Sequence, residues 1–526
     1  MLKQQKATVF FQRSRVTLAS SFPTSSKIAK MAAEDGSARA QQQESGQIKQ
    51  TRQTRPPSVY FPLGYKEAAY QWWTSVTPPM VERKVLSFIP TLREAADSAA
   101  NPNASSTPDP LGTRVWRRTM VQLSGKNRAL NEVCVEKIGD KTEETLVVVH
   151  GYGAGLGFFY KNLEPITRRP GLKLYALDML GMGNSSRPAF RIHAKDREQQ
   201  VIEAEDWFID ALEEWRRKRK IDRFTLLGHS LGGYLAVSYA LKYPGHLKKL
   251  ILASPVGIPE DPYAVNASMP EPDESTLANE FTQDQTQITQ TGHDTAAAAK
   301  AAAAAKAAAA AAASSKAPAP PGAPKRPIPS WLVWLWDANV SPFSIIRMTG
   351  PLGPRFVSGW TSRRFNHLPG PEAQALHDYA FSIFKQKGSG EYALAYVLAP
   401  GAYARRPVIN RIQDVGRQPI PSPDSSSSDA PAKKETGFPI VFMYGENDWM
   451  DVAGGLASEE KLKRAREEAL ARATDEEKQM ENGSVKVVIV PKAGHHLYLD
   501  NAEFFNDALQ KEMDDVFATS KKRNDH

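Results

Sequence analysis

Short apolar runs separated by longer amphipathic stretches recur through the middle and the end of the chain. Leu146–Val149 is a continuous apolar run, typical of a strand that is buried on both faces. Further strand-like runs occupy 116–123, 131–137, 174–178, 224–227, 247–253, 439–444 and 485–490, and 201–216 has the spacing of an amphipathic helix. Strands that alternate with helices predict an α/β fold with a mostly parallel central sheet flanked by helices.

This pattern is interrupted by polar and low-complexity stretches, which suggest how the chain is divided. Residues 296–313 are almost pure alanine and the following stretch is rich in proline, so we expect an exposed insertion that is at most transiently helical. The predicted parts are a basic, disordered tail (1–59), a helical segment and linker (60–111), a first core part (112–258), an inserted helical lid region (259–436) with a disordered insertion (about 261–327), a second core part (437–519) and a C-terminal tail (520–526).

The strand at 224–227 leads directly into Gly228-His229-Ser230-Leu231-Gly232, a Gly-x-Ser-x-Gly sequence, and helix-like spacing follows it. Strand, turn and helix are the context of a nucleophile elbow, in which a strained turn presents a serine. Gly228 and Gly232 supply the minimal side chains that such a turn needs. Ser230 is therefore the candidate nucleophile, and the N–H of Leu231 is a candidate donor to an oxyanion.

Two later strand ends carry the partners that a serine nucleophile requires. Asp448 follows the strand at 439–444, and His495 follows the strand at 485–490. The imidazole would take the proton of the serine hydroxyl, and the carboxylate would orient the imidazole and stabilise its charged form. The order Ser230, Asp448, His495 is the order that the α/β-hydrolase topology requires.

Neighbouring residues offer alternatives to each partner. Asp451 and Glu446 lie close to Asp448 but fit the Gly-x-x-Asp spacing less well, and His496 directly follows His495. The stretch from His495 to Asp500 also fits His-x-x-x-x-Asp, a motif of acyltransferases, although Asp500 could instead cap the helix that follows.

The loop after Val149 contains several glycines that allow its backbone to approach a substrate closely. The Tyr152 N–H is therefore the candidate second oxyanion donor. His150 and His229 are interpreted as structural groups that support these loops.

Three sequences outside the hydrolase motifs carry a resemblance to one family. These are Leu-Pro-Gly-Pro-Glu (368–372), Ser-Gly-Glu (389–391) and Gly-Ala-Tyr-Ala-Arg-Arg-Pro (401–407). With them, residues from about 72 to 500 resemble the branch of α/β-hydrolase domain proteins that includes lysophospholipid and N-acylphosphatidylethanolamine lipases, a lipid-droplet lipase co-activator and mitochondrial cardiolipin-specific deacylases. The long alanine-rich insertion departs from the pattern of this family.

The resemblance implies a serine hydrolase that removes an acyl chain from a phospholipid or lysophospholipid without a metal or cofactor, with cardiolipin as one candidate substrate. The co-activator relatives lack the serine, whereas this chain keeps Ser230. The alternatives are a non-catalytic lipase regulator and a protein similar to lysophosphatidic acid acyltransferases.

Charge and the N-terminus suggest where the protein acts. The net charge of +9 suits an anionic membrane surface, and no nucleic-acid-binding signature is present. Residues 1–33 are basic and contain no acidic residue, which is typical of a mitochondrial transit peptide. No stretch has the length and apolarity of a membrane span. We therefore expect a peripheral mitochondrial protein, with the cytosol or a lipid droplet as the alternative. The adjacent residues Trp72 and Trp73 cannot share one helix face, so we expect one to pack inward and the other to meet lipid or the lid.

Overall fold

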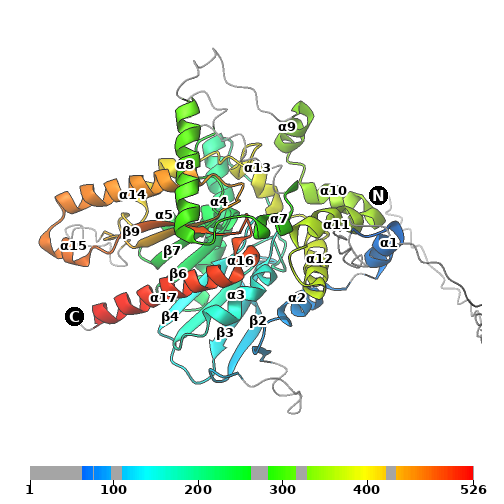
Figure 1. The fold of residues 1–526 in the computed structure, drawn as a ribbon, viewed down its shortest axis with the longest axis horizontal. Coiled ribbons are helices and arrows are strands. Elements are labelled where there is room, and N and C mark those ends of the chain that lie inside the picture. The colour runs from blue at the N-terminus through cyan, green and yellow to red at the C-terminus, as the bar shows by residue number, and fades with distance from the viewer. Residues whose placement is uncertain are drawn as a thin grey trace, which may run out of the picture. The chain divides into compact units, whose positions relative to one another are not determined.

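The fold was analysed in a computed structural model, which describes residues 62–74, 76–95, 109–261, 282–314, 329–421 and 434–524. The predictions for residues 1–59, including the transit peptide, lie outside these ranges. The described residues all belong to one unit, which is built around a single nine-stranded sheet with helices on both faces (Figure 1).

The sheet confirms the predicted fold class. From β5 to β9 all neighbouring strands are parallel, whereas β3 is antiparallel to both β2 and β5. The order across the sheet is β1-β2-β3-β5-β4-β6-β7-β8-β9. The strands are β1 (Arg93–Glu94), β2 (Arg114–Gln122), β3 (Ala129–Lys137), β4 (Glu144–Val149), β5 (Leu172–Leu177), β6 (Phe224–His229), β7 (Leu247–Ala253), β8 (Pro439–Gly445) and β9 (Ser484–Val490).

The continuous apolar runs arise because each central strand is buried on both faces. Leu226 and Leu250 pack into one hydrophobic cluster, and their chain neighbours Leu227 and Ile251 pack into the cluster on the opposite face. Helices α4 (Arg197–Lys218), α5 (Leu231–Lys242), α8 (Ala296–Ser314) and α14 (Val452–Arg472) contribute to the first cluster. Helices α2 (Pro78–Leu86), α3 (Tyr160–Ile166), α12 (Gly370–Phe384) and α17 (Ala502–Asn524) contribute to the second.

A helical region, here called the cap, lies between β7 and β8 in the chain, where the sequence predicted a lid. It contains α9 (Ser330–Asp337), α10 (Pro342–Met348), α11 (Gly353–Arg364), α12 and α13 (Leu394–Val397). Helix α1 (Tyr65–Trp73) contacts α11, and α2 contacts α12, so the two N-terminal helices join the cap to the core. The remaining helices are α7 (Gln285–Gln290), α15 (Asp475–Met480) and α16 (Leu497–Asp500).

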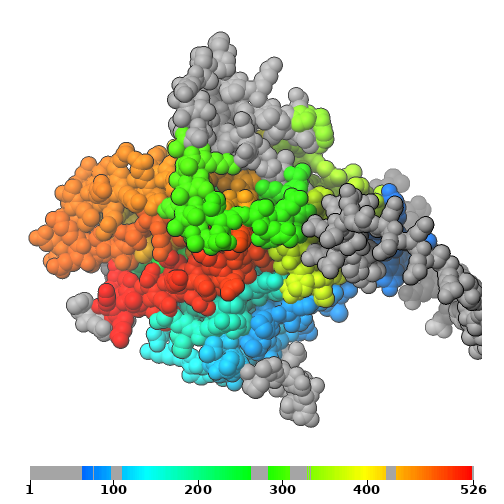
Figure 2. All heavy atoms as spheres, in the orientation of Figure 1, coloured from blue at the N-terminus to red at the C-terminus, as the bar shows by residue number. Residues whose placement is uncertain are grey.

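The expectation of a disordered insertion at about 261–327 is wrong for its described part. Helix α8 contacts α14 and β9, and Ala299 is completely buried (Figure 2, where α8 is bright green and α14 orange). Ile288 on α7 is also buried. Alanine has no hydrophobic periodicity within such a run, so the sequence cannot mark the buried face. Its small side chain nevertheless lets the helix approach its neighbours closely.

Two smaller expectations also fail. Trp72 and Trp73 are 42% and 81% exposed, so neither packs inward. Helix α17 continues to Asn524, so most of the predicted C-terminal tail (520–526) is helical. Cys134, the single cysteine, lies on β3 and is buried, and burial raises the pKa of its thiol to about 12.

Candidate active site

Ser230 occupies the sharp turn between β6 and α5. Its φ of 53° and ψ of −117° lie in a region that residues other than glycine rarely adopt. The Ser230 N–H donates to the Ala253 carbonyl (2.9 Å), while the Ser230 carbonyl accepts from the N–H groups of Gly233 (3.0 Å) and Tyr234 (3.2 Å). These bonds hold the turn in its strained conformation at the carboxyl edge of the sheet, where the parallel strands end.

The turn leaves no room for larger side chains on either side of Ser230. A Cβ atom on Gly228 would lie 2.3 Å from the Gly232 carbonyl oxygen, and one on Gly232 would lie 2.5 Å from the His150 carbonyl oxygen. Gly151 is similarly close, since a Cβ there would lie 2.8 Å from Ser230 Cβ. The glycines thus allow β6, α5 and the loop after β4 to meet around the serine.

Asp448 and His495 are brought together from the ends of β8 and β9. His495 Nδ1 lies 3.1 Å from Asp448 Oδ1, and both side chains are almost completely buried. The same carboxylate accepts hydrogen bonds from Met450 N–H (3.0 Å) and from the Ser254 hydroxyl. These donors fix the carboxylate in a position that orients the imidazole.

Ser230 and His495 lie near each other at the carboxyl edge of the sheet. No hydrogen bond joins their side chains within the described ranges. The rings of His229 and His495 are 4.8 Å apart between centroids, and Ser230 directly follows His229. His229 Nε2 lies 3.0 Å from the His495 carbonyl oxygen, which ties the elbow to the histidine loop. Catalytic hydrogen bonds are often long before substrate binds, so this geometry is compatible with proton transfer.

The alternative carboxylates have other partners. Asp451 caps α14 by accepting a hydrogen bond from Ala453 N–H (2.8 Å). Glu446 accepts from Lys492 N–H (3.0 Å) and from His293 N–H (2.8 Å). Asp448 is therefore the carboxylate of the three that contacts His495.

The alternative histidine and the acyltransferase motif also have structural roles. His496 is buried, and burial lowers its pKa well below 6.5. Asp500 accepts a hydrogen bond from Gly494 N–H (2.9 Å), which orients the loop that carries His495. The suggestion that Asp500 caps the next helix is wrong, because the side chain of Asn501 accepts from Phe504 N–H (3.2 Å) at the start of α17.

The two candidate oxyanion donors flank Ser230. In the part of the chain that the structure describes, neither the Tyr152 N–H nor the Leu231 N–H donates to another backbone or side-chain group. The ring of Tyr152 stacks on Phe343 of α10, with centroids 5.1 Å apart, and Phe343 stacks on Phe384 of α12 at 4.5 Å. The cap thus packs directly against the loop that would bind the oxyanion.

His150 and His229 are uncharged supports of these loops. His150 Nδ1 donates to the Gly151 carbonyl (2.7 Å), and its Nε2 accepts from Met179 N–H (3.1 Å). Burial lowers the pKa of His150 to about 4, and burial also lowers that of His229 well below 6.5. Two neutral imidazoles therefore hold the backbone beside Ser230.

Three further residues contribute to this site, although no sequence motif marks them. Ser254 bonds Asp448, Trp449 lies with its ring 5.0 Å from that of His495, and Ile288 of α7 lies against the histidine loop at Gly494. Ser254 could have been noticed, since a polar residue follows the apolar run of β7. The contribution of α7 had no signal, because its six residues are polar apart from Ile288.

The described residues were also searched for metal-binding groups and membrane-spanning helices. No group of three or more His, Cys, Asp and Glu side chains among them could hold a metal ion. None of their helices is both long enough and apolar enough to cross a membrane. The sheet order and the turn at Ser230 define the α/β-hydrolase class of fold.

Comparison with known proteins agrees with this classification. The family model for the alpha/beta hydrolase fold matches residues 144–502, so the chain belongs to the α/β-hydrolase family. A 1-acylglycerol-3-phosphate O-acyltransferase of Arabidopsis thaliana is 29% identical, over 81% of this chain and 78% of its own. A human (lyso)-N-acylphosphatidylethanolamine lipase is 27% identical, over 75% of this chain and 86% of its own. The mouse 1-acylglycerol-3-phosphate O-acyltransferase ABHD5 is 27% identical, over 75% and 84% respectively.

Proposed function

We propose that this protein is a serine hydrolase that deacylates a phospholipid or lysophospholipid. The observation that carries the proposal is the hydrogen-bonded Asp448–His495 pair beside a strained Ser230. A serine held in a strained turn next to an oriented imidazole has little structural purpose of its own, because the strain costs stability.

The reaction has two halves. Ser230 Oγ attacks the ester carbonyl while His495 Nε2 takes the hydroxyl proton, and the N–H groups of Tyr152 and Leu231 stabilise the oxyanion. His495 then gives that proton to the departing lipid alcohol, which leaves an acyl–serine ester. Water, activated by the same imidazole, attacks this ester and releases the fatty acid and the free serine. Asp448 stabilises the imidazolium in both halves.

A lipid substrate is supported by the relatives, whose names refer to acylglycerol phosphates and N-acylphosphatidylethanolamine. Cardiolipin and a mitochondrial location remain part of the proposal on the strength of residues 1–33 alone. Fusion of residues 1–40 to a fluorescent reporter tests this location, and a diffuse cytosolic signal would remove the reason for favouring cardiolipin.

The substrate would be reached from a membrane surface. Large apolar side chains are exposed on α1, on the cap and at the start of α2: Trp73, Met80, Met348 and Phe356 are 81%, 61%, 85% and 59% exposed. Helix α11 contacts both α1 and α10, so these residues belong to adjoining helices. Exposed tryptophan is favourable at a lipid–water boundary, and the net charge of +9 favours an anionic leaflet.

A direct test is labelling of the purified full chain by a fluorophosphonate probe. Wild-type protein should be labelled and should release fatty acid from phospholipid vesicles, whereas Ser230→Ala should do neither. Ser238→Ala is a matched control, since Ser238 is a buried serine of α5 whose hydroxyl donates to the Tyr234 carbonyl of the same helix. Equal labelling of wild type and Ser230→Ala would exclude Ser230 as the nucleophile.

Acyl transfer is a second candidate, because two of the relatives are named as acyltransferases. The Asp500 carboxylate accepts a hydrogen bond from the backbone N–H of Gly494, a structural role that weakens the motif-based argument. Incubation with an acyl-coenzyme A and lysophosphatidic acid distinguishes the two. Formation of phosphatidic acid that Ser230→Ala retains would favour a transferase independent of the proposed serine.

A further inference from the structure

A large groove opens at the amino edge of the sheet, which is the edge opposite Ser230 and the one at which the parallel strands begin. It has a volume of about 1280 Å³ and is lined by the starts of β4, β7, β8 and β9 together with the last turns of α17. Strand β7 begins at this groove and ends at Ala253, which bonds Ser230. Seven residues of strand separate the groove from the candidate active site by roughly 20 Å. The groove and the candidate active site therefore lie at opposite edges of the sheet.

The groove has a strong excess of positive charge. Nine basic side chains line it, against four acidic ones. The basic residues are Lys141, Arg169, Arg223, Lys248, Lys249, Lys486, Lys521, Lys522 and Arg523. The acidic residues are Glu143, Glu144, Glu512 and Asp515. Three of the four acidic groups are already engaged: Glu144 pairs with Lys248 and Glu512 with Lys249, each at 2.8 Å, and Asp515 lies 3.7 Å from Lys249.

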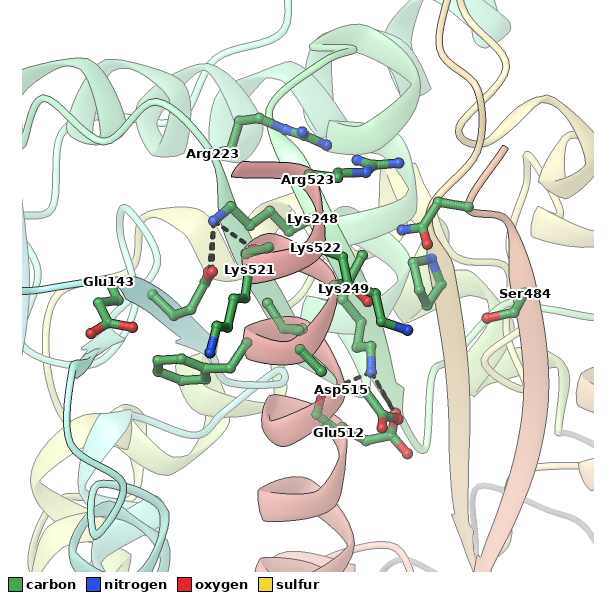
Figure 3. A pocket seen from close by; sticks show the side chains of 18 of the residues that line it. Glu143, Arg223, Lys248, Lys249, Ser484, Glu512, Asp515, Lys521, Lys522 and Arg523 are labelled. Atoms are coloured by element: carbon green, nitrogen blue, oxygen red, sulfur yellow. Dashed lines mark hydrogen bonds and ion pairs between the residues drawn. The ribbon is translucent and has the colours of Figure 1, made fainter. Parts of the chain in front are cut away.

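Five of the basic side chains have no carboxylate within ion-pair distance among the described residues: Lys141, Arg223, Lys521, Lys522 and Arg523. They come from the loop before β4, the start of β6 and the end of α17. Figure 3 shows the guanidinium groups of Arg223 and Arg523 side by side at one end of the groove. Like charges repel, and burial together with Arg523 keeps the pKa of Arg223 below its ordinary value although Asp222, Glu435 and Glu144 act in the opposite direction. An anion bound between the two guanidinium groups would reduce this repulsion.

Each of the two arginines makes few hydrogen bonds with the residues that the structure describes. Arg223 donates one hydrogen bond to the Leu247 carbonyl (3.0 Å), and Arg523 donates one to the Met480 carbonyl (3.1 Å). The Nε–H of Arg223 is buried and has no acceptor in the described part of the chain. A buried donor without an acceptor is costly, and an anionic oxygen would satisfy it.

The C-terminal end of α17 attracts positive charge through its helix dipole, but this attraction does not explain all the basic residues of the groove. The negative end of a helix dipole corresponds to about half an elementary charge, so one cation in the last turn suffices to balance it. Helix α17 has three, Lys521, Lys522 and Arg523, and Arg223 adds a fourth from another element.

We propose that this groove binds the phosphate group of a ligand larger than inorganic phosphate, held between Arg223 and Arg523 with Lys521 and Lys522 beside them. Planar guanidinium groups match the geometry of phosphate oxygens and bind them in pairs. The volume of the groove accommodates a substituent on the phosphate. The phosphate could belong to a soluble ester or to a lipid headgroup, and the two sources share this chemistry.

Calorimetric titration of the full chain with inorganic pyrophosphate tests the soluble source. Sedimentation with vesicles of phosphatidylcholine alone, or of equimolar phosphatidylcholine and phosphatidic acid, tests the headgroup. Two double variants remove charge from the groove: Arg223→Gln with Arg523→Gln, and Lys521→Gln with Lys522→Gln. The second pair is fully on the surface, so it remains informative if the first fails to fold. Lys463→Gln with Arg464→Gln on α14 is the control, because it removes the same charge outside the groove.

Pyrophosphate binding that weakens about tenfold or more in the groove variants, and less than about twofold in the control, supports the proposal with a soluble ligand. Loss of the phosphatidic-acid-dependent sedimentation in the same variants, without pyrophosphate binding, supports it with a headgroup. Absence of both responses in wild type, or equal loss in the α14 control, overturns it. Ester hydrolysis should stay unchanged in all groove variants, so failure of this proposal and failure of the hydrolase proposal are separate results.

Discussion

The same parallel strands present two different kinds of surface at their two ends. At the carboxyl edge, Asp448 and His495 are almost completely buried. Hydrogen bonds from the Ser254 hydroxyl and the Met450 N–H hold the Asp448 carboxylate in place. At the amino edge, Lys521, Lys522 and Arg523 lie exposed in an open groove. The buried edge depends on geometry, since an unpaired polar group there is costly, whereas the open edge depends on an excess of charge that water can screen. Single substitutions should therefore act strongly at the first edge and weakly at the second.

The largest expected effect comes from Ser230→Ala. Removal of the proposed nucleophile should lower kcat roughly a millionfold, as in the serine proteases, while the melting temperature stays equal or rises because strain is relieved. Ester hydrolysis and thermal unfolding measured on the same preparations check both parts. Ser238→Ala on the same helix should keep full activity, and comparable losses in the two variants would point to damage of α5 rather than to lost chemistry.

Asp448→Asn should have the next largest effect. The amide would favour the wrong tautomer of His495, with a loss of kcat of up to roughly ten-thousand-fold. Asp451→Asn is the control, because Asp451 caps α14 and asparagine caps helices nearly as well as aspartate. Steady-state kinetics of both variants decides the assignment. A large loss of kcat in Asp451→Asn together with nearly full activity in Asp448→Asn would show that Asp451, and not Asp448, is the catalytic carboxylate.

A pH effect is expected from Glu82 on α2, which is buried beside Asp178 at the end of β5. Burial and, to a lesser extent, the nearby Asp178 carboxylate raise the pKa of Glu82 to about 7, against the opposing effect of Arg118. Since the folded-state pKa lies above the ordinary value of 4.5, the stability that this group contributes is present below pH 4.5 and is lost as the pH rises through 7.

Glu82→Gln should remove this loss, which amounts to about 3 kcal/mol at most for a shift of this size. Urea unfolding at pH 5 and pH 8 measures it, and the difference between the two pH values should shrink in the variant. Glu67→Gln on the exposed side of α1 is the control and should leave the difference unchanged. A difference in unfolding free energy equal to that of wild type would show that Glu82 is ionised at both pH values.

The smallest expected effect comes from a substitution in α7. This helix packs against the histidine loop at the carboxyl edge of the sheet, although no sequence motif marks it. Ile288→Ala removes a buried side chain beside Gly494 and should lower the free energy of unfolding by about 2 kcal/mol. Ile345→Ala on α10 is the control, because Ile345 is 49% exposed and should cost within about 0.5 kcal/mol. Equal unfolding midpoints of Ile288→Ala and wild type would mean that α7 does not pack stably on the histidine loop.

The sequence could predict those parts of the molecule that carry a local signal. The buried strands appear as apolar runs. Ser230 lies in a short motif, and the sequence pattern also indicates the strand before it and the helix after it. Asp448 could be chosen over Asp451 by spacing, and the structure places Asp448 against His495.

Contacts between distant residues could not be predicted. Ser254 reaches Asp448 across 194 positions of the chain, and no pattern marks such a pair. Ala299 is buried whereas Ala297 and Ala298, which are chemically identical to it, are exposed, so only the position of α14 and β9 selects it. Trp72 and Trp73 remained exposed because hydrophobicity alone does not indicate whether a partner is present to cover a side chain.

The single buried cysteine makes the protein unusually simple to label. Only the thiolate reacts with alkylating reagents, and a pKa of about 12 leaves almost none of Cys134 in that form at neutral pH. A cysteine introduced at an exposed position, such as Met348 on the cap, would therefore carry a fluorophore or spin label selectively without removal of the native residue. Conversely, the rate at which Cys134 itself becomes modified would report how often β3 separates from β2 and β5.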